Sequence, residues 1–458
     1  MGERANIGRT LHFANALLPG GWASDVRIGV ADGVVSAIAA DEPARPDDER
    51  HAIGLPGMSN LHSHAFQRGM AGLAESRGAS DDSFWTWRET MYRFVDRIDP
   101  DQLQAIAALA YAEMLETGFT RVGEFHYLHH DPKGDAYADP ACMSQAIMAA
   151  AAESGIALTH LPVFYAHGGF GGAAPSPAQR RFVHDLDGFA ALLGAVRSAA
   201  AQLTDAIVGV APHSLRAVTA DQLRALAAMA GTAPIHIHIA EQRREVDDCL
   251  AWCGRRPVEW LLDEMPVDAG WCLVHATHMT PTEAVRLAAS GAVAGLCPIT
   301  EANLGDGIFA AAPFLAAGGR FGIGSDSNVM IDVTEELRWL EYGQRLAGQA
   351  RNVWASAPGR SSGEDMFIGA VAGGAQALGV AAGLVVGGAA DLFSVDAEHP
   401  SLAGKSLSTI LDGLVFAGGR GAIDTVWCRG EKRVSGGRHH ARDELAARYR
   451  RVLSALTA

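Results

Sequence analysis

Four short segments, far apart in the chain, carry side chains that can bind one metal ion and move protons beside it. The first segment reads LHSH at residues 61–64. Residues two apart in an extended strand point to the same side, so His62 and His64 can reach the same ion. The second segment reads HIHIAE at residues 236–241. In it we expect His238 to be a third imidazole ligand and Glu241 to be a proton shuttle.

The third and fourth segments each place a titratable residue at the end of an apolar run, at His275 and at Asp326. We expect Asp326 to be a carboxylate ligand and a proton acceptor, and His275 to be an acid, a base or a hydrogen-bond donor. We expect His236 to fill space or support the site rather than bind the metal. The predicted ligands are therefore His62, His64, His238 and Asp326, and the predicted catalytic residues are Glu241, His275 and Asp326. Such a set suits one divalent ion, and we expect zinc, although iron and manganese also accept these ligands.

The composition limits the other classes of function. The chain has 458 residues, 48% of them hydrophobic, and a net charge of −15. It can form a large core, and its surface repels nucleic acid and anionic lipid. We see no signal peptide and no apolar segment of membrane-spanning length, so we expect a cytoplasmic protein that binds neither nucleic acid nor membranes. The six cysteines are scattered, which indicates free thiols rather than a disulfide framework.

The elements that must position these side chains follow a repeating pattern. Between residues 56 and 382, apolar runs alternate with helical stretches, and Asp99, Thr219 and Thr280 mark helix starts, each with a carboxylate or amide three residues later. The expected strands cover residues 55–61, 121–125, 157–163, 207–211, 234–239, 271–275, 292–297 and 320–324. Eight such units favour an α/β fold with a closed (β/α)₈ barrel of the TIM type, whose strand ends meet at one mouth.

The two ends of the chain indicate a second, smaller domain. Residues 1–55 and 383–458 contain short Gly- and Val-rich runs typical of strands, and residues 442–456 have the pattern of an amphipathic helix. We expect a small β-sandwich with a C-terminal helix, built from both termini. The barrel of residues 56–382 is then inserted between its two halves.

The order HxH, HxxE, His, Asp resembles the amidohydrolase superfamily, and the resemblance covers essentially the whole chain, including VVGGAADLFSV at residues 385–395. It implies hydrolysis of a carbon–nitrogen bond with the help of a metal ion. The segment IVGVAPH at residues 207–213 offers neither a lysine nor a glutamate to bridge two metals. The resemblance therefore points to the mononuclear deaminase branch, with one divalent ion.

Within that branch, five stretches resemble the formimidoylglutamate deiminases, which convert N-formimidoyl-L-glutamate and water to N-formyl-L-glutamate and ammonia in histidine degradation. These stretches are HAFQR at 64–68, FWTWR at 84–88, GEFHYLHH at 123–130, PHSLR at 212–216 and PITEANLGDG at 298–307. The resemblance implies a small dianionic substrate and a homodimer. It also implies substrate contacts from Gln67, Arg88, Tyr127, His213 and Arg216.

The residue types agree with a dianionic substrate. An acidic protein must supply local cations to hold two carboxylates, and Arg88 and Arg216 can each do so through a planar guanidinium. Arg88 also has a structural interpretation, as a residue paired with Glu89 or stacked on Trp85.

Two alternatives remain open. One is a deaminase of a nucleobase or nucleoside-derived substrate, of the guanine or S-adenosylhomocysteine type, although Glu301 departs from the pattern of those enzymes. The other is a catalytically silent scaffold, against which the complete ligand set argues. For His126, His129 and His130 we expect solvated or supporting roles rather than a second metal site.

Overall fold

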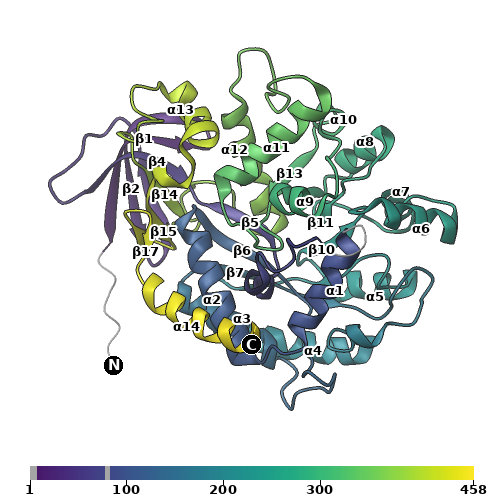
Figure 1. Ribbon diagram of the computed structural model, residues 1–458. Coiled ribbons are helices and arrows are strands. Elements are labelled where there is room, and N and C mark those ends of the chain that lie inside the picture. The colour runs from purple at the N-terminus through teal and green to yellow at the C-terminus, as the bar shows by residue number, and fades with distance from the viewer. Residues whose placement is uncertain (1–7, 78–82, 458) are drawn as a thin grey trace.

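A closed barrel of parallel strands forms the centre of the molecule (Figure 1). The computed structural model describes residues 8–77 and 83–457. The barrel strands are β5 (Met58–Ser63), β6 (Phe119–His126), β7 (Ala157–Phe164), β8 (Ile207–Val208) continued by β9 (Ala211–Pro212), β10 (Ile235–Ile239), β11 (Trp271–His275), β12 (Val293–Leu296) and β13 (Arg320–Ile323). Single bridges from Val210 to Ile235 and from Ser63 to Asp326 join the two halves of the barrel. The predicted (β/α)₈ fold is therefore confirmed.

Helices surround this barrel and cover its strands. They are α2 (Pro100–Glu116), α3 (Cys142–Ser154), α4 (Leu186–Ala200), α5 (Ala220–Ala230), α6 (Arg243–Cys253), α7 (Pro257–Glu264), α8 (Pro281–Ser290), α9 (Pro298–Leu304), α10 (Ala311–Ala316), α11 (Val333–Gly348) and α12 (Ser362–Ala377). The predicted capping boxes form at Asp99, Thr219 and Thr280, where each side chain accepts the backbone N–H three residues on. Two short 3₁₀ turns, η1 (Ala65–Met70) and η2 (Pro177–Gln179), and helix α1 (Phe84–Val95) lie in the loops that follow β5 and β7.

The chain termini build one eight-stranded sheet, in the order β17-β16-β15-β14-β4-β1-β2-β3. Its strands are β1 (Arg9–Leu18), β2 (Gly21–Ala31), β3 (Val34–Ala39), β4 (Glu49–Pro56), β14 (Leu392–Val395), β15 (Ile423–Cys428), β16 (Glu431–Ser435) and β17 (Arg438–His439). The rings of Phe13 on β1 and Trp427 on β15 are 6.2 Å apart although two strands separate β1 from β15 in the sheet. The sheet therefore curves around a hydrophobic core of its own. The small domain is one continuous curved sheet and not the expected sandwich of two separate sheets.

The last strand before the barrel begins in this outer sheet. Pro56 at the end of β4 pairs with Leu392, and Met58 then starts β5. The residue between them is Gly57, where a Cβ atom would lie 2.2 Å from Oγ1 of Thr120. The single strand expected at residues 55–61 is therefore two strands, because only glycine fits where the chain passes from one sheet to the other.

The C-terminal helix α14 (Arg442–Thr457) packs on α2 and supports the segment after β5. Arg442 pairs with Glu113 at 3.0 Å and with Glu116 at 3.2 Å. Glu113 also holds Arg68 of η1 at 2.6 Å, and the Tyr449 hydroxyl donates to the Arg68 carbonyl at 3.0 Å. The end of the chain thus fixes the turn that directly follows His64. Helix α13 (Leu407–Gly413) and the turns η3 (Leu414–Gly418) and η4 (Gly419–Ala422) connect β14 to β15.

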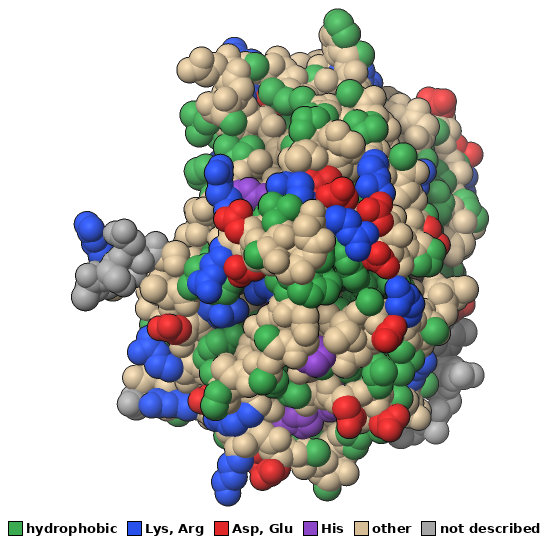
Figure 2. Space-filling model, turned by 90° about the vertical axis from the view of Figure 1, so that its right-hand side faces the viewer, with side chains coloured by type: hydrophobic (Ala, Val, Ile, Leu, Met, Phe, Trp, Pro, Cys, Tyr) green, Lys and Arg blue, Asp and Glu red, His purple; other side chains and the backbone are tan. Residues whose placement is uncertain are grey.

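The surface on the right-hand side of Figure 1 carries charges of both signs. Figure 2 shows Lys and Arg side chains intermixed with Asp and Glu over this face. Pairs of this kind join α7 to α8, where Asp263 lies 2.6 Å from Arg286 and 3.6 Å from Arg255. Within residues 8–77 and 83–457, no helix combines the length and the apolar character of a membrane span.

Candidate active site

The four predicted metal ligands converge at the carboxyl ends of the barrel strands. The Nε2 atom of His62 lies 3.2 Å from that of His64 and 3.0 Å from that of His238. The Oδ1 atom of Asp326 lies 3.4 Å from His62 Nε2 and 3.2 Å from His64 Nε2. One ligand atom from each of the four residues lies within 4.8 Å of the others. Side chains from β5, from β10 and from the end of β13 thus point to one place.

Hydrogen bonds to backbone carbonyls fix the protons of two of these imidazoles. Nδ1 of His64 donates to the Phe125 carbonyl at 2.8 Å, and Nδ1 of His238 donates to the His213 carbonyl at 3.1 Å. A carbonyl oxygen only accepts, so each proton resides on Nδ1 and each Nε2 has a free lone pair. Both lone pairs therefore face the common centre, as ligation requires.

The spacing of the donor atoms fits a tetrahedral ion. Bonds of about 2.0–2.1 Å from a tetrahedral zinc ion place its ligand atoms about 3.3 Å apart. Four of the six separations among the ligand atoms run from 3.0 to 3.4 Å, and all six are within 4.8 Å. The cluster therefore has the geometry and the donor set of a metal site.

A buried network of amide and hydroxyl groups holds the two strand ends that carry the HxH pair and Asp326. Ser325 N–H donates to Asn60 Oδ1 at 3.0 Å, and Asn328 Nδ2 donates to the His64 carbonyl and to Ser63 Oγ at 3.1 Å each. The backbone of Asp326 has a φ of 44°, in the left-handed region that residues other than glycine rarely adopt. This network holds Asp326 in that conformation and directs its carboxylate toward the imidazoles.

Two further titratable groups lie against the ligand cluster. His275 Nε2 is 3.7 Å from Asp326 Oδ2 and 3.9 Å from Glu241 Oε1. Its Nδ1 donates to Glu301 Oε1 at 3.2 Å, so Glu301 orients the ring. His275 and Glu241 therefore stand on one side of the cluster, where both can reach a reacting group.

Burial and neighbouring charges shift the pKa values of these groups in different directions. Burial raises the pKa of Glu241 to about 7, against the opposing effect of the charges on His275 and Arg216. Burial alone would lower the pKa of His275, but the carboxylates of Glu241, Glu301 and Asp326 outweigh it and raise that pKa to about 10. Burial would likewise raise the pKa of Asp326, yet the imidazoles of His62 and His64 beside its carboxylate hold it well below its usual range. The structure thus favours an ionised Asp326, a protonated His275 and a Glu241 that can change protonation near neutral pH.

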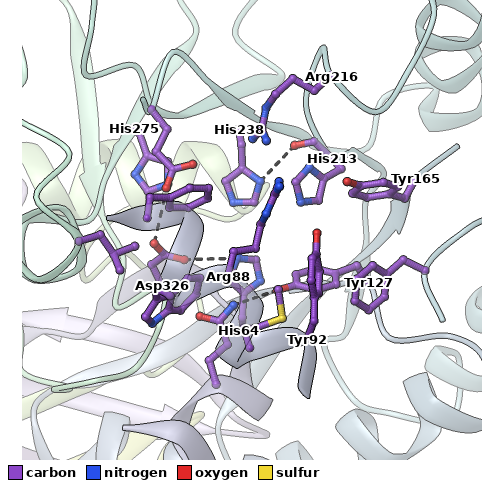
Figure 3. A pocket seen from close by; sticks show the side chains of 17 residues that line it. His64, Arg88, Tyr92, Tyr127, Tyr165, His213, Arg216, His238, His275 and Asp326 are labelled. Carbon is purple, nitrogen blue, oxygen red and sulfur yellow. Dashed lines mark hydrogen bonds and ion pairs between the residues drawn. The ribbon is translucent and has the colours of Figure 1, made fainter. Parts of the chain in front are cut away.

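A pocket opens beside the cluster and contains the predicted substrate contacts (Figure 3). Gln67, Arg88, Tyr127, His213 and Arg216 all line it, together with the ligands His64, His238 and Asp326. About 560 Å³ of space lies between its walls, including the solvent at its mouth. The pocket walls come from α1 and from the loops after β5, β7 and β9.

The two arginines of the pocket have few protein partners. Arg216 is 9% exposed, and its Nε lies 3.9 Å from Glu245 Oε2 with no hydrogen bond. The guanidinium carbon of Arg88 lies 4.4 Å from the centre of the Trp85 ring. In the described part of the chain, Arg88 forms no ion pair with an acidic side chain. The stacking interpretation of Arg88 is thus correct, but the side chain lines the pocket as well.

The other three predicted contacts surround the HxH pair. Nε2 of Gln67 donates to the Tyr127 hydroxyl at 2.9 Å, and Oε1 of Gln67 is buried without a partner. The His213 ring lies 5.0 Å from the ligand ring of His238 and 5.8 Å from the Tyr127 ring. Figure 3 shows Tyr127 and His213 directed into the same space as Arg88. These groups can therefore contact one bound molecule together.

Three other histidines, His126, His129 and His236, are buried in the folded protein. His236 lies on the same strand as His238, but its Nε2 donates to the Ala377 carbonyl at 2.7 Å, away from the ligand cluster. For His126 and His129 we expected solvated or supporting roles, and the solvated role is excluded because both side chains are at most 2% exposed. They pack between the barrel and its helices, where the ring of His126 lies 5.5 Å from the rings of both His129 and His160.

Several residues that shape the site were not predicted from the sequence. Glu245 accepts the backbone N–H groups of Ala240 and Glu241 at 3.0 and 3.3 Å, and so turns Glu241 toward the pocket. Glu301 holds His275, although the sequence indicated only that Glu301 is unusual at its position. Tyr92 and Tyr165 add two hydroxyl groups to the pocket wall. No local motif marks the two glutamates, because their partners become neighbours only when the chain folds.

The comparisons with known proteins agree with this geometry. Residues 53–433 match the model of the Amidohydrolase family, and residues 9–52 match that of the Formimidoylglutamate deiminase HutF, N-terminal domain. The chain is 51% identical to a formimidoylglutamate deiminase of Pseudomonas aeruginosa, over 96% of this chain and 98% of that protein. It is 30% identical to a 5-methylthioadenosine/S-adenosylhomocysteine deaminase of Natronomonas pharaonis, over 78% of this chain and 75% of that protein.

A solved structure shares the fold across nearly the whole chain. It is an amidohydrolase from Brucella melitensis, with a TM-score of 0.95 and 54% identity, and the match covers 98% of this chain and 100% of that one. The ligand cluster at the barrel mouth and these matches agree, and the chain belongs to the amidohydrolase family, in its formimidoylglutamate deiminase branch.

Proposed function

We propose that the protein hydrolyses N-formimidoyl-L-glutamate to N-formyl-L-glutamate and ammonia, as a step of histidine degradation. The similarity to the Pseudomonas aeruginosa deiminase supports this reaction. The observation that carries the proposal is the pair Arg88 and Arg216, which line one pocket beside the ligand cluster. Arg88 has no acidic partner among the described residues, and Arg216 has only a long ion pair of 3.9 Å with Glu245. A protein of net charge −15 that keeps two such cations in one pocket is suited to a dianionic ligand.

The residues of the site can divide the reaction among them. A divalent metal held by His62, His64, His238 and Asp326 supplies Lewis-acid activation and lowers the pKa of a water molecule toward about 7. Asp326 directs Oδ1 to the imidazoles, which leaves Oδ2 to accept a proton from the attacking water. His275 faces Oδ2 through its Nε2 and can donate a hydrogen bond to the charge that develops on the substrate.

Glu241 is placed to deliver the proton that the leaving group needs. A pKa of about 7 lets its carboxyl group take up a proton and release it at neutral pH. Water contributes an oxygen to the formimidoyl carbon, the bond from that carbon to the terminal nitrogen breaks, and the nitrogen leaves as ammonia. Arg88 and Arg216 hold the two carboxylates and thereby keep the formimidoyl carbon against the cluster.

We propose zinc as the metal, because three imidazole nitrogens and one carboxylate oxygen at tetrahedral spacing suit that ion. Elemental analysis of protein purified without added metal tests this choice. One zinc per chain is the expected result, whereas iron or manganese in its place would overturn it. The homodimer stays a prediction from the resemblance, and the mass in solution by light scattering tests it.

The reaction is tested by coupled measurement of ammonia release. The purified protein should release ammonia from N-formimidoyl-L-glutamate much faster than from guanine or S-adenosylhomocysteine at equal concentration. S-Adenosylhomocysteine is included because a deaminase of that class is 30% identical to this chain. Faster release from either competitor would overturn the proposed substrate, and no release from any of the three would favour the silent scaffold.

A further inference from the structure

Two tyrosines of the pocket wall have an arrangement that goes beyond the five predicted contacts. Tyr92 belongs to α1, and Tyr165 directly follows β7. A single buried side chain, Gln179 of η2, reaches both of them. Its Nε2 lies 2.5 Å from the Tyr165 hydroxyl and 3.4 Å from the Tyr92 hydroxyl. Gln179 is 3% exposed, so this contact is shielded from water.

The hydrogen bonds of Gln179 determine which way the two hydroxyl groups donate. Its Oε1 accepts the Ser176 N–H at 2.7 Å, in the capping box that starts η2. The amide nitrogen must therefore face the tyrosines, and each phenol oxygen accepts a bond from it. A hydroxyl that accepts in this way keeps its own hydrogen for another partner. Among residues 8–77 and 83–457, neither hydroxyl has a protein acceptor, so both hydrogens are available to a ligand.

Tyr127 has a similar arrangement on the same side of the pocket, where Gln67 Nε2 donates to its hydroxyl. Together with Arg88 and Arg216, the three phenols place five side chains with hydrogen-bond donors on the pocket wall. Carboxylates only accept, so a wall of this kind favours anionic groups and disfavours amides, which also carry donors. Burial raises the pKa values of Tyr127 and Tyr165, which keeps both phenols protonated.

The rings of the pocket show how far Tyr165 lies from the metal ligands. His238 is a ligand, the His213 ring lies 5.0 Å from it, and the Tyr165 ring lies 4.7 Å beyond His213. In Figure 3, Tyr165 stands on the side of the pocket opposite Asp326 and His275. In N-formimidoyl-L-glutamate, the side-chain carboxylate is about 6 Å from the formimidoyl carbon when extended, and the α-carboxylate is about 4 Å away. The tyrosines are therefore placed for the side-chain carboxylate.

We propose that Tyr92 and Tyr165 donate hydrogen bonds to the side-chain carboxylate of the substrate, and that Gln179 positions both hydroxyls for this purpose. The proposal rests on the proposed function, because it assumes a glutamate-derived substrate. It assigns Tyr92 and Tyr165 as residues that determine specificity. Gln179 is a positioning residue that acts through them.

Binding of the proposed reaction product and of an analogue that differs only at this carboxylate tests the assignment. N-formyl-L-glutamate carries the side-chain carboxylate, and N-formyl-L-glutamine carries a neutral amide of nearly equal size. Calorimetric titration of the metal-loaded protein gives the ratio of the two affinities. In the double variant Tyr92→Phe/Tyr165→Phe, this ratio should fall about 10- to 100-fold, the usual loss when a hydrogen bond to a charged group is removed.

Matched variants separate this effect from a general change in the fold. Tyr342→Phe removes a hydroxyl on α11, whose ring stacks on Phe416 away from the pocket, and should leave the ratio unchanged. Gln179→Met keeps the length and loses the amide, and should lower the ratio about 3- to 10-fold with little change in the affinity for N-formyl-L-glutamine. A Gln179→Met protein with the wild-type ratio would overturn the positioning role.

The assignment of the tyrosines is overturned if the double variant keeps the wild-type ratio, or if it weakens both ligands equally. Turnover of N-formimidoyl-L-glutamate by the wild type reports on the proposed function separately. A protein that prefers N-formyl-L-glutamate through these tyrosines but releases no ammonia would overturn the reaction and leave the carboxylate assignment in place. If the wild type releases ammonia but the double variant keeps the wild-type affinity ratio, the carboxylate assignment is overturned and the proposed reaction stands.

Discussion

Replacement of His160 should remove part of the sensitivity of the fold to acid. His160 lies in the middle of β7, fully buried, and neither of its ring nitrogens has a hydrogen-bond partner in the described part of the protein. The nearest aromatic neighbour is the ring of His126 at 5.5 Å, which is also neutral because burial holds its pKa well below the usual range. Burial lowers the pKa of His160 to about 3. The folded protein therefore keeps this imidazole neutral where an unfolded chain would protonate it.

The size of the effect follows from the difference in protonation. An unfolded histidine binds its proton near pH 6.5, so below that value the unfolded state gains free energy that the folded state does not. The free energy of unfolding then falls by about 1.4 kcal/mol for each pH unit, from about pH 6.5 down to the folded pKa. Between about pH 7.5 and about pH 5.5, His160 alone should cost the wild type about 1.4 kcal/mol. A variant without a titratable group at this position should not show that loss in the free energy of unfolding.

The assay compares urea unfolding at the two pH values, followed by tryptophan fluorescence, for the wild type, His160→Leu and His160→Gln. Both variants should lose about 1.4 kcal/mol less than the wild type over this pH interval, whatever their stability at the higher pH. The exposed His440 provides the control His440→Leu, which should behave as the wild type. Equal losses in the wild type and in both His160 variants would refute the claim that the imidazole is neutral when folded.

Three further predictions concern the site. Glu241→Gln should lower the turnover of saturating N-formimidoyl-L-glutamate about 10²- to 10⁴-fold with unchanged metal content, and turnover near the wild type would show that Glu241 is not the proton shuttle. Arg88→Met should lower kcat/KM about 100-fold with the metal retained, while Arg93→Met, an exposed residue of the same helix, should change neither. Loss of the metal from Arg88→Met would indicate a structural role. Asp326→Asn should abolish metal retention through dialysis, and a variant that keeps its metal would show that Asp326 is not a ligand.

The barrel could be predicted from the sequence because its strands are buried on both faces. Every residue of β6, β7 and β11 is buried. Most residues of β7 and β11 are accordingly apolar, whereas β6 also carries Arg121, Glu124 and His126. The boundary at Gly57 could not be predicted in the same way. Residues 49–63 form two strands of different sheets, and the contact with Thr120 that separates them joins parts of the chain 63 positions apart.

The ligands could be predicted because their spacing within each segment carries the signal. His62 and His64 are close in sequence, and their two Nε2 atoms are 3.2 Å apart. Strict alternation is still only part of the reason, because the pairing of β5 with β6 changes register between Asn60 and Ser63. Such an irregularity redirects side chains at the end of a strand. The convergence itself depends on Asp326, whose left-handed backbone no local motif predicts.

The groups that select the substrate follow a different rule from the groups that bind the metal. The four ligands lie on the barrel strands or in the residues directly after them. Arg88 and Tyr92 come from α1, and Tyr165, His213 and Arg216 come from the loops after β7 and β9. Loops tolerate sequence changes better than strands do, so a related enzyme can keep the same metal ligands and bind a different substrate. The metal site could therefore be inferred from four short motifs, whereas the arrangement of the tyrosines depends on Gln179, which contacts both hydroxyl groups only in the folded chain.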